Sequence, residues 1–392
     1  MGLTTEYPNL NEILNEYCQK MKGTQFLENA SYFYYLTNEL NSLIRQEFTL
    51  SELNKLKVKS KADSKKLSLE ESLLLVTEYL EERLPQYKNR FLLNLNDGTF
   101  NIIADREEGK KENTNAGKQN GRLFINVPLE YTTEDPTSII HEFLHTINHE
   151  KEKTMLRRYV TETISIYFES DLCNFLKAKG FTEEEVIVND IYRLRDLAGC
   201  TEHFLEMIPI LDSFRLLGPI NSNTYDDMVK LGVFPRYSKK EDFYEIVTDY
   251  EQKLAAIAEK NEKLHITERS LRVDPFVTFG YMVGTLVSYY VIAEGTTELH
   301  QKMINMNDIV NIDAFSSLRT HLESGKSIEE YPHTIGLIEL ANIDNLSNIM
   351  EYLGLDIKDE KKLKDKLLPP LKRKIKQIKD YSNGQKDITK EK

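Results

Sequence analysis

Two histidines four residues apart, with a glutamate directly after the first, constrain this chain more than any other feature; they lie in the segment His141-Glu142-Phe143-Leu144-His145. Residues four apart share one face of an α-helix, so both imidazoles can reach a single metal ion. The glutamate can take a proton from a metal-bound water as that water attacks a carbonyl carbon. The neighbouring sequence predicts the required helix, with Asp135 as its N-cap and Pro136 at its first position. The alternative is a helix that carries two surface histidines.

A second helix is predicted from Met155 to Lys179, with Gly180 as its C-cap. Within this helix, Glu162 and Glu169 are spaced so that they lie on one face. Glu162 comes 17 residues after His145, which leaves room for the first helix to end and for the second to pack alongside it. The sequence therefore predicts that a carboxylate approaches the two histidines.

Catalytic zinc sites take three protein ligands and leave one position for water. We therefore predict one Zn2+ per chain, with Glu142 as the general base. The predicted zinc ligands are two imidazoles and one carboxylate: His141, His145 and Glu162. Glu169 is predicted to accept a hydrogen bond from a ligand histidine and so to orient its ring. The alternative for Glu162 is a surface ion pair with Arg157 or Arg158.

His149 lies a further four residues along the chain and could project toward the same face. A metzincin pattern would need its third histidine ten residues after the first, and position 151 is a lysine. We therefore predict that His149 is not a ligand. The charged residues that follow it predict a solvated turn between the two helices.

Three motifs occur in the same order as in a known family. The first two are His141-Glu142-x-x-His145 and Glu162-x-x-Ser165-x-x-x-Glu169, and the third is the aromatic segment Phe276-Val-Thr-Phe279-Gly-Tyr281-Met-Val-Gly284. Together they resemble the gluzincin metallopeptidases of the thimet oligopeptidase and oligoendopeptidase F family, over residues 90 to 300. The resemblance implies a zincin-like peptidase that cleaves short peptides, with an elongated, two-lobed helical architecture and zinc in a deep cleft.

The aromatic segment departs from the family pattern. In that family a tyrosine of this segment, helped by a histidine slightly upstream, donates hydrogen bonds to the oxyanion of the tetrahedral intermediate. Here Phe279 stands where the phenol is expected, and it has no hydrogen-bond donor. Tyr281 is the first candidate to replace it, with Arg272 and His265 behind it. A core aromatic without a catalytic role is the alternative for Tyr281.

The region before the first motif predicts a small β-sheet. Thr99 to Ala104 and Arg122 to Val127 are rich in β-branched and aromatic residues, whereas Glu107 to Gly121 is polar and predicts an exposed, mobile loop. An edge strand of a zincin sheet can hold an extended peptide by backbone hydrogen bonds. We predict that Arg122 to Val127 is that strand or its neighbour; the alternative is a hairpin that only covers the core.

The rest of the chain favours helices, because glycine and proline are sparse and the helical period recurs nearly throughout. The predicted fold class is mainly α with a small sheet. Three segments are predicted: an N-terminal helical lobe at residues 1–90, a catalytic region at 91–300, and a helical region with a charged tail at 301–392.

The composition of the chain limits the kinds of molecule that it is expected to bind. A net charge of −12 argues against nucleic acid, because phosphate binding needs a concentrated basic surface. Three scattered cysteines favour a reducing compartment, and no apolar run approaches the length of a membrane span. We therefore expect a cytoplasmic protein that acts on peptides; non-classical secretion would leave the same absence of a signal peptide. The oligomeric state has no signature in the sequence.

Two classes of function follow from these patterns. The first is a zinc-dependent endopeptidase for short peptides, or a protease with a single protein target. The second is a zinc-binding scaffold that has lost catalytic activity. The phenylalanine at position 279, in place of a tyrosine, suggests this second class. The intact glutamate at position 142 favours the enzyme.

Overall fold

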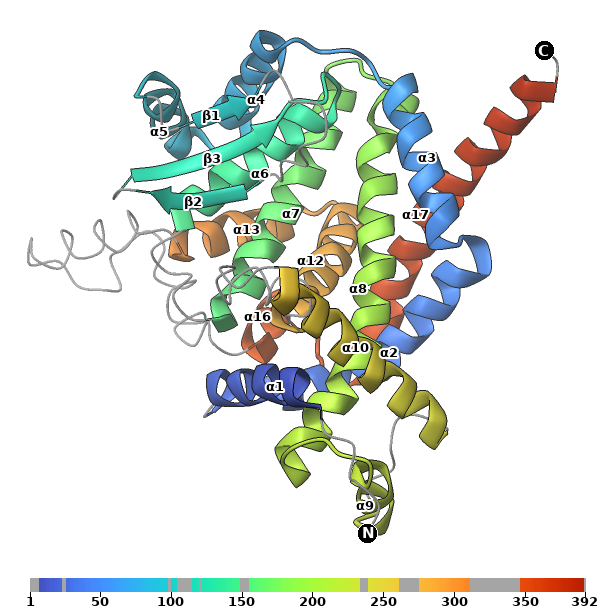
Figure 1. Cartoon of the computed structure of the whole chain (residues 1–392). Coiled ribbons are helices and arrows are strands. Elements are labelled where there is room, and N and C mark those ends of the chain that lie inside the picture. Colours follow the sequence, from blue (N-terminus) through green and yellow to red (C-terminus); the bar gives the residue numbers. More distant parts are fainter. Residues whose placement is uncertain are drawn as a thin grey trace, which may run out of the picture. The chain divides into compact units, whose positions relative to one another are not determined.

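The computed structural model describes residues 7–22, 26–97, 100–103, 115–119, 122–148, 155–232, 239–260, 275–310 and 346–390. Within these residues the chain is mainly α-helical, as the sequence predicts (Figure 1). Helices occur in both the N-terminal and the C-terminal parts of the chain, and three strands lie between residues 100 and 128.

The helices follow the order of the chain, with these bounds: α1 (Pro8–Met21), α2 (Phe26–Glu47), α3 (Leu50–Asp63), α4 (Leu69–Arg83), α5 (Pro85–Asn96), α6 (Glu134–Asn148), α7 (Met155–Ala178), α8 (Glu183–Leu217), α9 (Thr224–Lys230), α10 (Lys240–Lys260), α12 (Pro275–Glu294), α13 (Thr297–Val310), α16 (Leu346–Tyr352) and α17 (Glu360–Lys390).

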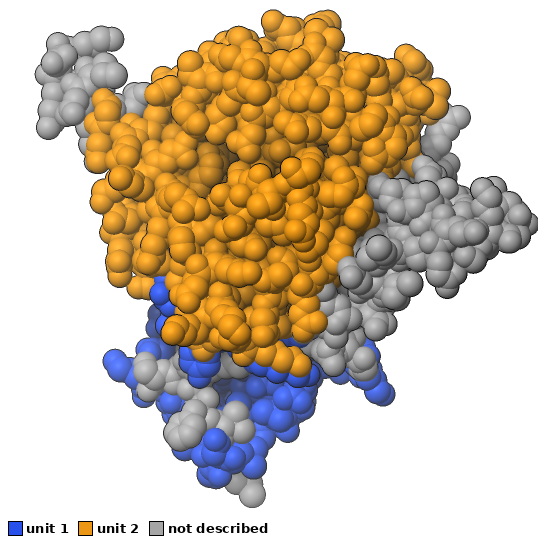
Figure 2. Space-filling model, turned by 180° about the vertical axis from the view of Figure 1, so that it is seen from behind, with its two compact units in different colours: residues 1–39, 200–279 blue, residues 40–199, 280–392 orange. Residues whose placement is uncertain are grey.

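The chain divides into two compact units, which Figure 2 shows in separate colours. Unit 1 comprises residues 1–39 and 200–279, and unit 2 comprises residues 40–199 and 280–392. The boundaries of these units fall inside the helices α2, α8 and α12. The three segments expected from the sequence stay a prediction. His141, His145 and Glu162 all belong to unit 2.

The three strands form one sheet in unit 2, in the order β1-β3-β2. β1 (Phe100–Ile103) runs parallel to β3 (Arg122–Pro128), and β2 (Asn115–Gln119) runs antiparallel to it. The central strand is therefore β3, so residues 122–127 neighbour an edge strand and are not the edge itself. β2 lies inside the range predicted to be a loop. Its sequence has no apolar alternation, and its pairing with β3 makes it a strand.

Helix α6 packs against β3 and β2, and its apolar side is anchored by aromatic rings. The ring of Phe143 lies 5.2 Å from that of Phe91 on α5 and 6.1 Å from that of Phe100 on β1, both edge-to-face. The apolar face of this helix is fully buried, and its members are Ile140, Phe143, Leu144 and Ile147. The two histidines of the motif therefore project from a helix that is fixed on its other side.

The start of α6 differs from the prediction. Asp135 is its second residue, and its carboxylate accepts hydrogen bonds from the backbone N–H groups of Glu130 (2.8 Å) and Thr132 (3.3 Å). The N-cap assignment was wrong because this side chain turns back to close the preceding turn. Burial raises the pKa of Asp135 to about 6, although these backbone hydrogen bonds oppose the shift.

Helix α7 begins at Met155 as predicted and ends at Ala178, one residue before the predicted end. Gly180 follows with φ +96°, and the N–H of Phe181 bonds to the carbonyl of Leu176 at 3.1 Å. The predicted glycine C-cap is therefore confirmed, since only glycine adopts this backbone angle without strain. α7 packs against α6, α4 and α13.

In unit 1 an aromatic cluster surrounds Phe279, which is 1% exposed. Its ring lies 5.5 Å from that of Phe26, 5.4 Å from that of Phe33 and 5.4 Å from that of Phe204. Phe279 is therefore a core residue of this unit. None of the helices in the described ranges combines the length and the apolar character that a membrane crossing requires.

Candidate metal centre

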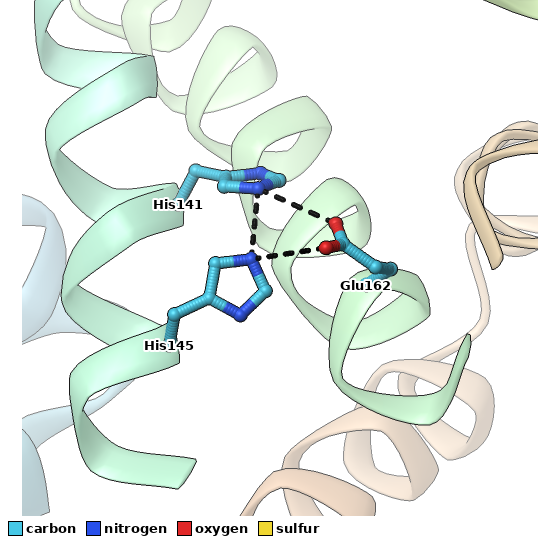
Figure 3. A group of neighbouring side chains, drawn as sticks. All are labelled: His141, His145 and Glu162. Atoms are coloured by element: carbon cyan, nitrogen blue, oxygen red, sulfur yellow. Dashed lines mark hydrogen bonds and ion pairs between the residues drawn. The ribbon is translucent and has the colours of Figure 1, made fainter. Parts of the chain in front are cut away.

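The two histidines of α6 and one glutamate of α7 point toward one another (Figure 3). His141 and His145 lie one turn apart on α6, and Glu162 reaches them from α7, which packs alongside. The separation in sequence is small, because the three residues lie within the segment from 141 to 162. The structure thus brings together the three residues that the sequence predicts as ligands.

The donor atoms lie at distances that suit a shared ion. The two Nε2 atoms are 3.0 Å apart, Glu162 Oε2 lies 3.6 Å from Nε2 of His141, and Glu162 Oε1 lies 3.5 Å from Nε2 of His145. One ligand atom from each residue can be chosen so that all lie within 4.8 Å of one another. Ligand atoms bonded to tetrahedral zinc at about 2.0–2.1 Å stand about 3.3 Å apart. The observed separations therefore fit a zinc ion between the three side chains.

Burial and the contacts among the three side chains shift the pKa values of His141 and Glu162. His141 is 5% exposed and His145 is 8% exposed. Burial lowers the pKa of His141, which favours the neutral imidazole that a metal needs. Burial alone would raise the pKa of Glu162, but the two histidines outweigh it and hold this pKa well below its ordinary value. The set thus offers two imidazoles and one carboxylate whose ionised form is favoured.

Glu169 fixes the tautomer of His141. Its Oε2 lies 3.1 Å from Nδ1 of His141, and both side chains are buried. A carboxylate can only accept a hydrogen bond, so Nδ1 is the donor and Nε2 presents its lone pair toward His145 and Glu162. This is the contact predicted for Glu169 from its position on the face of α7.

Arg193 of α8 was not predicted from the sequence. It is 6% exposed, and its Nε donates to Oε1 of Glu169 at 2.9 Å while a terminal nitrogen donates to Oε2 of the same carboxylate. The one signal in the sequence is that Arg193 follows Asn189 and precedes Leu197 at intervals of four, on a face of α8 whose members are all buried. A charged residue on a buried helical face needs a charged partner.

The charges of the centre also fit a divalent cation. Glu142, Glu162 and Glu169 are carboxylates, and Arg193 is the cation that bonds to one of them. With the carboxylates ionised, these four side chains carry two net negative charges in a largely buried space. Burying net charge is costly unless it is compensated. A divalent ion bound to the three ligands would neutralise it.

Glu142 is 6% exposed and lies next to His141 on α6. Tyr281 lies on α12, near enough to this centre for the charges of Glu162 and Glu142 to act on its phenol. The negative charge of Glu162, followed by burial and the smaller influence of Glu142, raises the pKa of Tyr281 well above its ordinary value. Tyr281 therefore keeps its phenolic proton near neutral pH and can donate a hydrogen bond.

A glycine brings α12 close to α7 at this point. A Cβ added to Gly284 would lie 2.9 Å from Cδ1 of Ile166, 3.0 Å from Cα of Thr163 and 3.3 Å from N of Thr163. Ser288, one turn further along α12, donates to the carbonyl of Ile166 at 3.5 Å. Tyr281 is three residues before Gly284, so the two residues lie on the same side of α12.

Some predicted positions lie outside the described residues or side chains. These are His149, Arg157, Arg158, His265, Arg272 and Phe276. The alternatives that depend on them stay predictions.

Comparisons with known proteins give no independent guide to this site. No protein-family model matches the chain, and neither a curated protein nor a solved structure matches it.

Proposed function

We propose that this chain is a zinc-dependent metallopeptidase of the gluzincin type, related to the thimet oligopeptidase and oligoendopeptidase F family. The observation that carries the proposal is the convergence of His141, His145 and Glu162 with Glu142 in the next position of the same helix. A metal site that served only to hold helices together would not need a carboxylate beside the ligands.

The chemistry divides between the ion and the side chains. Zinc, when bound, would supply a Lewis acid for the peptide carbonyl and would acidify a water molecule. Glu142 takes a proton from the attacking water and then passes it to the nitrogen of the leaving amine. Tyr281 donates a hydrogen bond to the oxygen of the former carbonyl as negative charge develops there. Glu169 keeps His141 in the tautomer that binds the ion.

The sheet supports a zincin-like interpretation of the fold. A three-stranded sheet precedes the helix of the two histidines, and its antiparallel edge strand β2 packs against that helix. In this proposal an extended peptide pairs with the outer edge of β2, which would hold its scissile bond near the centre. The substrates would be short, unstructured peptides, and the two-lobed shape with a deep cleft belongs to the same proposal.

The test compares the wild type with Glu142→Gln after both are loaded with zinc. Zinc content is measured first, and cleavage of a mixed library of quenched fluorescent peptides is measured second. We expect both proteins to hold one zinc ion and only the wild type to cleave peptides. Zinc binding without cleavage by either protein would favour a dedicated protein substrate or a scaffold, and absence of tight zinc binding would refute the metal centre.

A further inference from the structure

Arg193 bonds to Glu169, the carboxylate that accepts a hydrogen bond from His141. It is a buried residue of α8, and it forms two hydrogen bonds to Glu169 of α7, one to each carboxylate oxygen. A planar guanidinium that bonds to both oxygens fixes the plane of a carboxylate as well as its position. Glu169 therefore has little freedom to rotate.

The same carboxylate bonds to a ligand. Oε2 of Glu169 accepts from Nδ1 of His141 at 3.1 Å and also from a terminal nitrogen of Arg193. A continuous set of hydrogen bonds thus runs from α8 through α7 to α6 and ends on the ring whose Nε2 faces Glu162 at 3.6 Å. Any rotation of Glu169 would turn that ring or release its Nδ1 proton from the bond.

We propose that Arg193 is a positioning residue for the metal centre: it fixes Glu169, and through Glu169 it holds His141 in the orientation and tautomer that present Nε2 to the ion. This inference rests on the proposed zinc site and adds a residue to it. Arg193 touches neither the ligands' donor atoms nor, in the proposal, the substrate.

The two properties of Arg193 have opposite effects on a metal ion. Its positive charge repels a divalent cation, so removing the charge would by itself strengthen binding. Its planar guanidinium bonds to both oxygens of Glu169 and so orients this carboxylate. Losing this two-bond contact would weaken metal binding. Arg193→Lys separates the two, because lysine keeps the charge but offers a single ammonium group that cannot bond to a carboxylate in the planar, bidentate manner.

The experiment measures the dissociation constant of Zn2+ by competition with a chromophoric chelator, together with the visible absorption spectrum of the Co2+-substituted protein. We expect Arg193→Lys to weaken zinc binding about 10- to 100-fold, the usual effect of losing a side chain that orients a ligand. The cobalt spectrum should change as well, because it reports the arrangement of the ligands.

Arg195→Lys is the matched control. It makes the same substitution two residues along α8, where the arginine bonds to Asp196 and not to Glu169. We expect its zinc affinity and cobalt spectrum to equal those of the wild type. A general loosening of α8 would affect both variants, whereas loss of the two-bond contact with Glu169 affects only Arg193→Lys.

Glu169→Gln tests the connection from its other end. If Arg193 acts through Glu169, then Arg193→Lys should change zinc affinity by less than about twofold in the Glu169→Gln background. An undiminished effect in that background would overturn the inference, as would unchanged zinc affinity of Arg193→Lys alone. Failure of the wild type to bind zinc would overturn the zinc site itself and this inference with it.

Discussion

The close approach of α12 to α7 at Gly284 leads to a prediction whose size follows from the structure. In Gly284→Ala the new methyl group would lie 3.0 Å from Cα and 3.3 Å from N of Thr163. Backbone atoms cannot move aside as a flexible side chain can, so the helices must separate. Overpacking of this kind costs about 1–3 kcal/mol. Alanine regains about 1 kcal/mol over glycine in a helix interior, which leaves a net loss of about 0–2 kcal/mol.

Gly199→Ala provides the reference for this measurement. Gly199 lies inside α8, and an added Cβ there would have nothing within 4 Å. This substitution should stabilise the protein by about 0.5–1 kcal/mol. The difference between the two variants in urea or thermal unfolding therefore isolates the overpacking at Gly284 and should reach about 1–3 kcal/mol. Equal stability of the two variants would refute the reasoning.

The same substitution should also affect the proposed chemistry. Separation of α12 from α7 moves Tyr281 away from Glu162, whereas the three ligands come from α6 and α7 and keep their places. We expect Gly284→Ala to lower kcat for peptide cleavage and to leave the zinc affinity unchanged. A loss of zinc affinity equal to the loss of kcat would contradict this assignment of roles.

Glu162→Ala should lose tight zinc binding, measured by chelator competition, because it removes one of the three proposed ligands; wild-type affinity would show that the third ligand is another residue. Tyr281→Phe should lower kcat about 100- to 1000-fold with zinc retained, as expected for loss of an oxyanion donor; an unchanged kcat would make Tyr281 a packing residue. Burial, partly opposed by Glu134, lowers the pKa of Lys57 to about 8. Between pH 8 and the ordinary lysine pKa of 10.5, the unfolded state therefore binds more protons at this group than the folded state does. The contribution of Lys57 to the free energy of unfolding consequently rises with pH in this range. Lys57→Met should therefore be most stabilised relative to the wild type below about pH 8. The stability difference between the two proteins should shrink by at most about 1.4 kcal/mol per pH unit as the pH rises to about 10. A difference in thermal stability that does not change with pH would contradict this prediction.

Local periodicity accounts for what the sequence could predict. The positions of His141 and His145 on α6, and of Glu162 and Glu169 on α7, follow from the geometry of an α-helix, since each pair lies on one face. The glycine at the end of α7 follows from its freedom to adopt a positive φ. These features depend on neighbours within a few turns, so they can be derived without the fold.

The features that were missed depend on distant contacts. Arg193 meets Glu169 from a different helix, α8, and nothing in the intervening sequence links the two residues. The strand β2 owes its conformation to pairing with β3, and the carboxylate of Asp135 accepts bonds from a turn rather than from its own helix.

The short separation between the ligands has a consequence for the order of folding. All three come from two consecutive helices that pack against each other, and the chain between the first and the last ligand spans only residues 141 to 162. Contacts between residues close in sequence form early, because little chain entropy is lost when a short loop closes. A helical hairpin of α6 and α7 can therefore gather the ligands before α8 docks. The arginine of α8 would then reach Glu169 last, after the three proposed ligands have met.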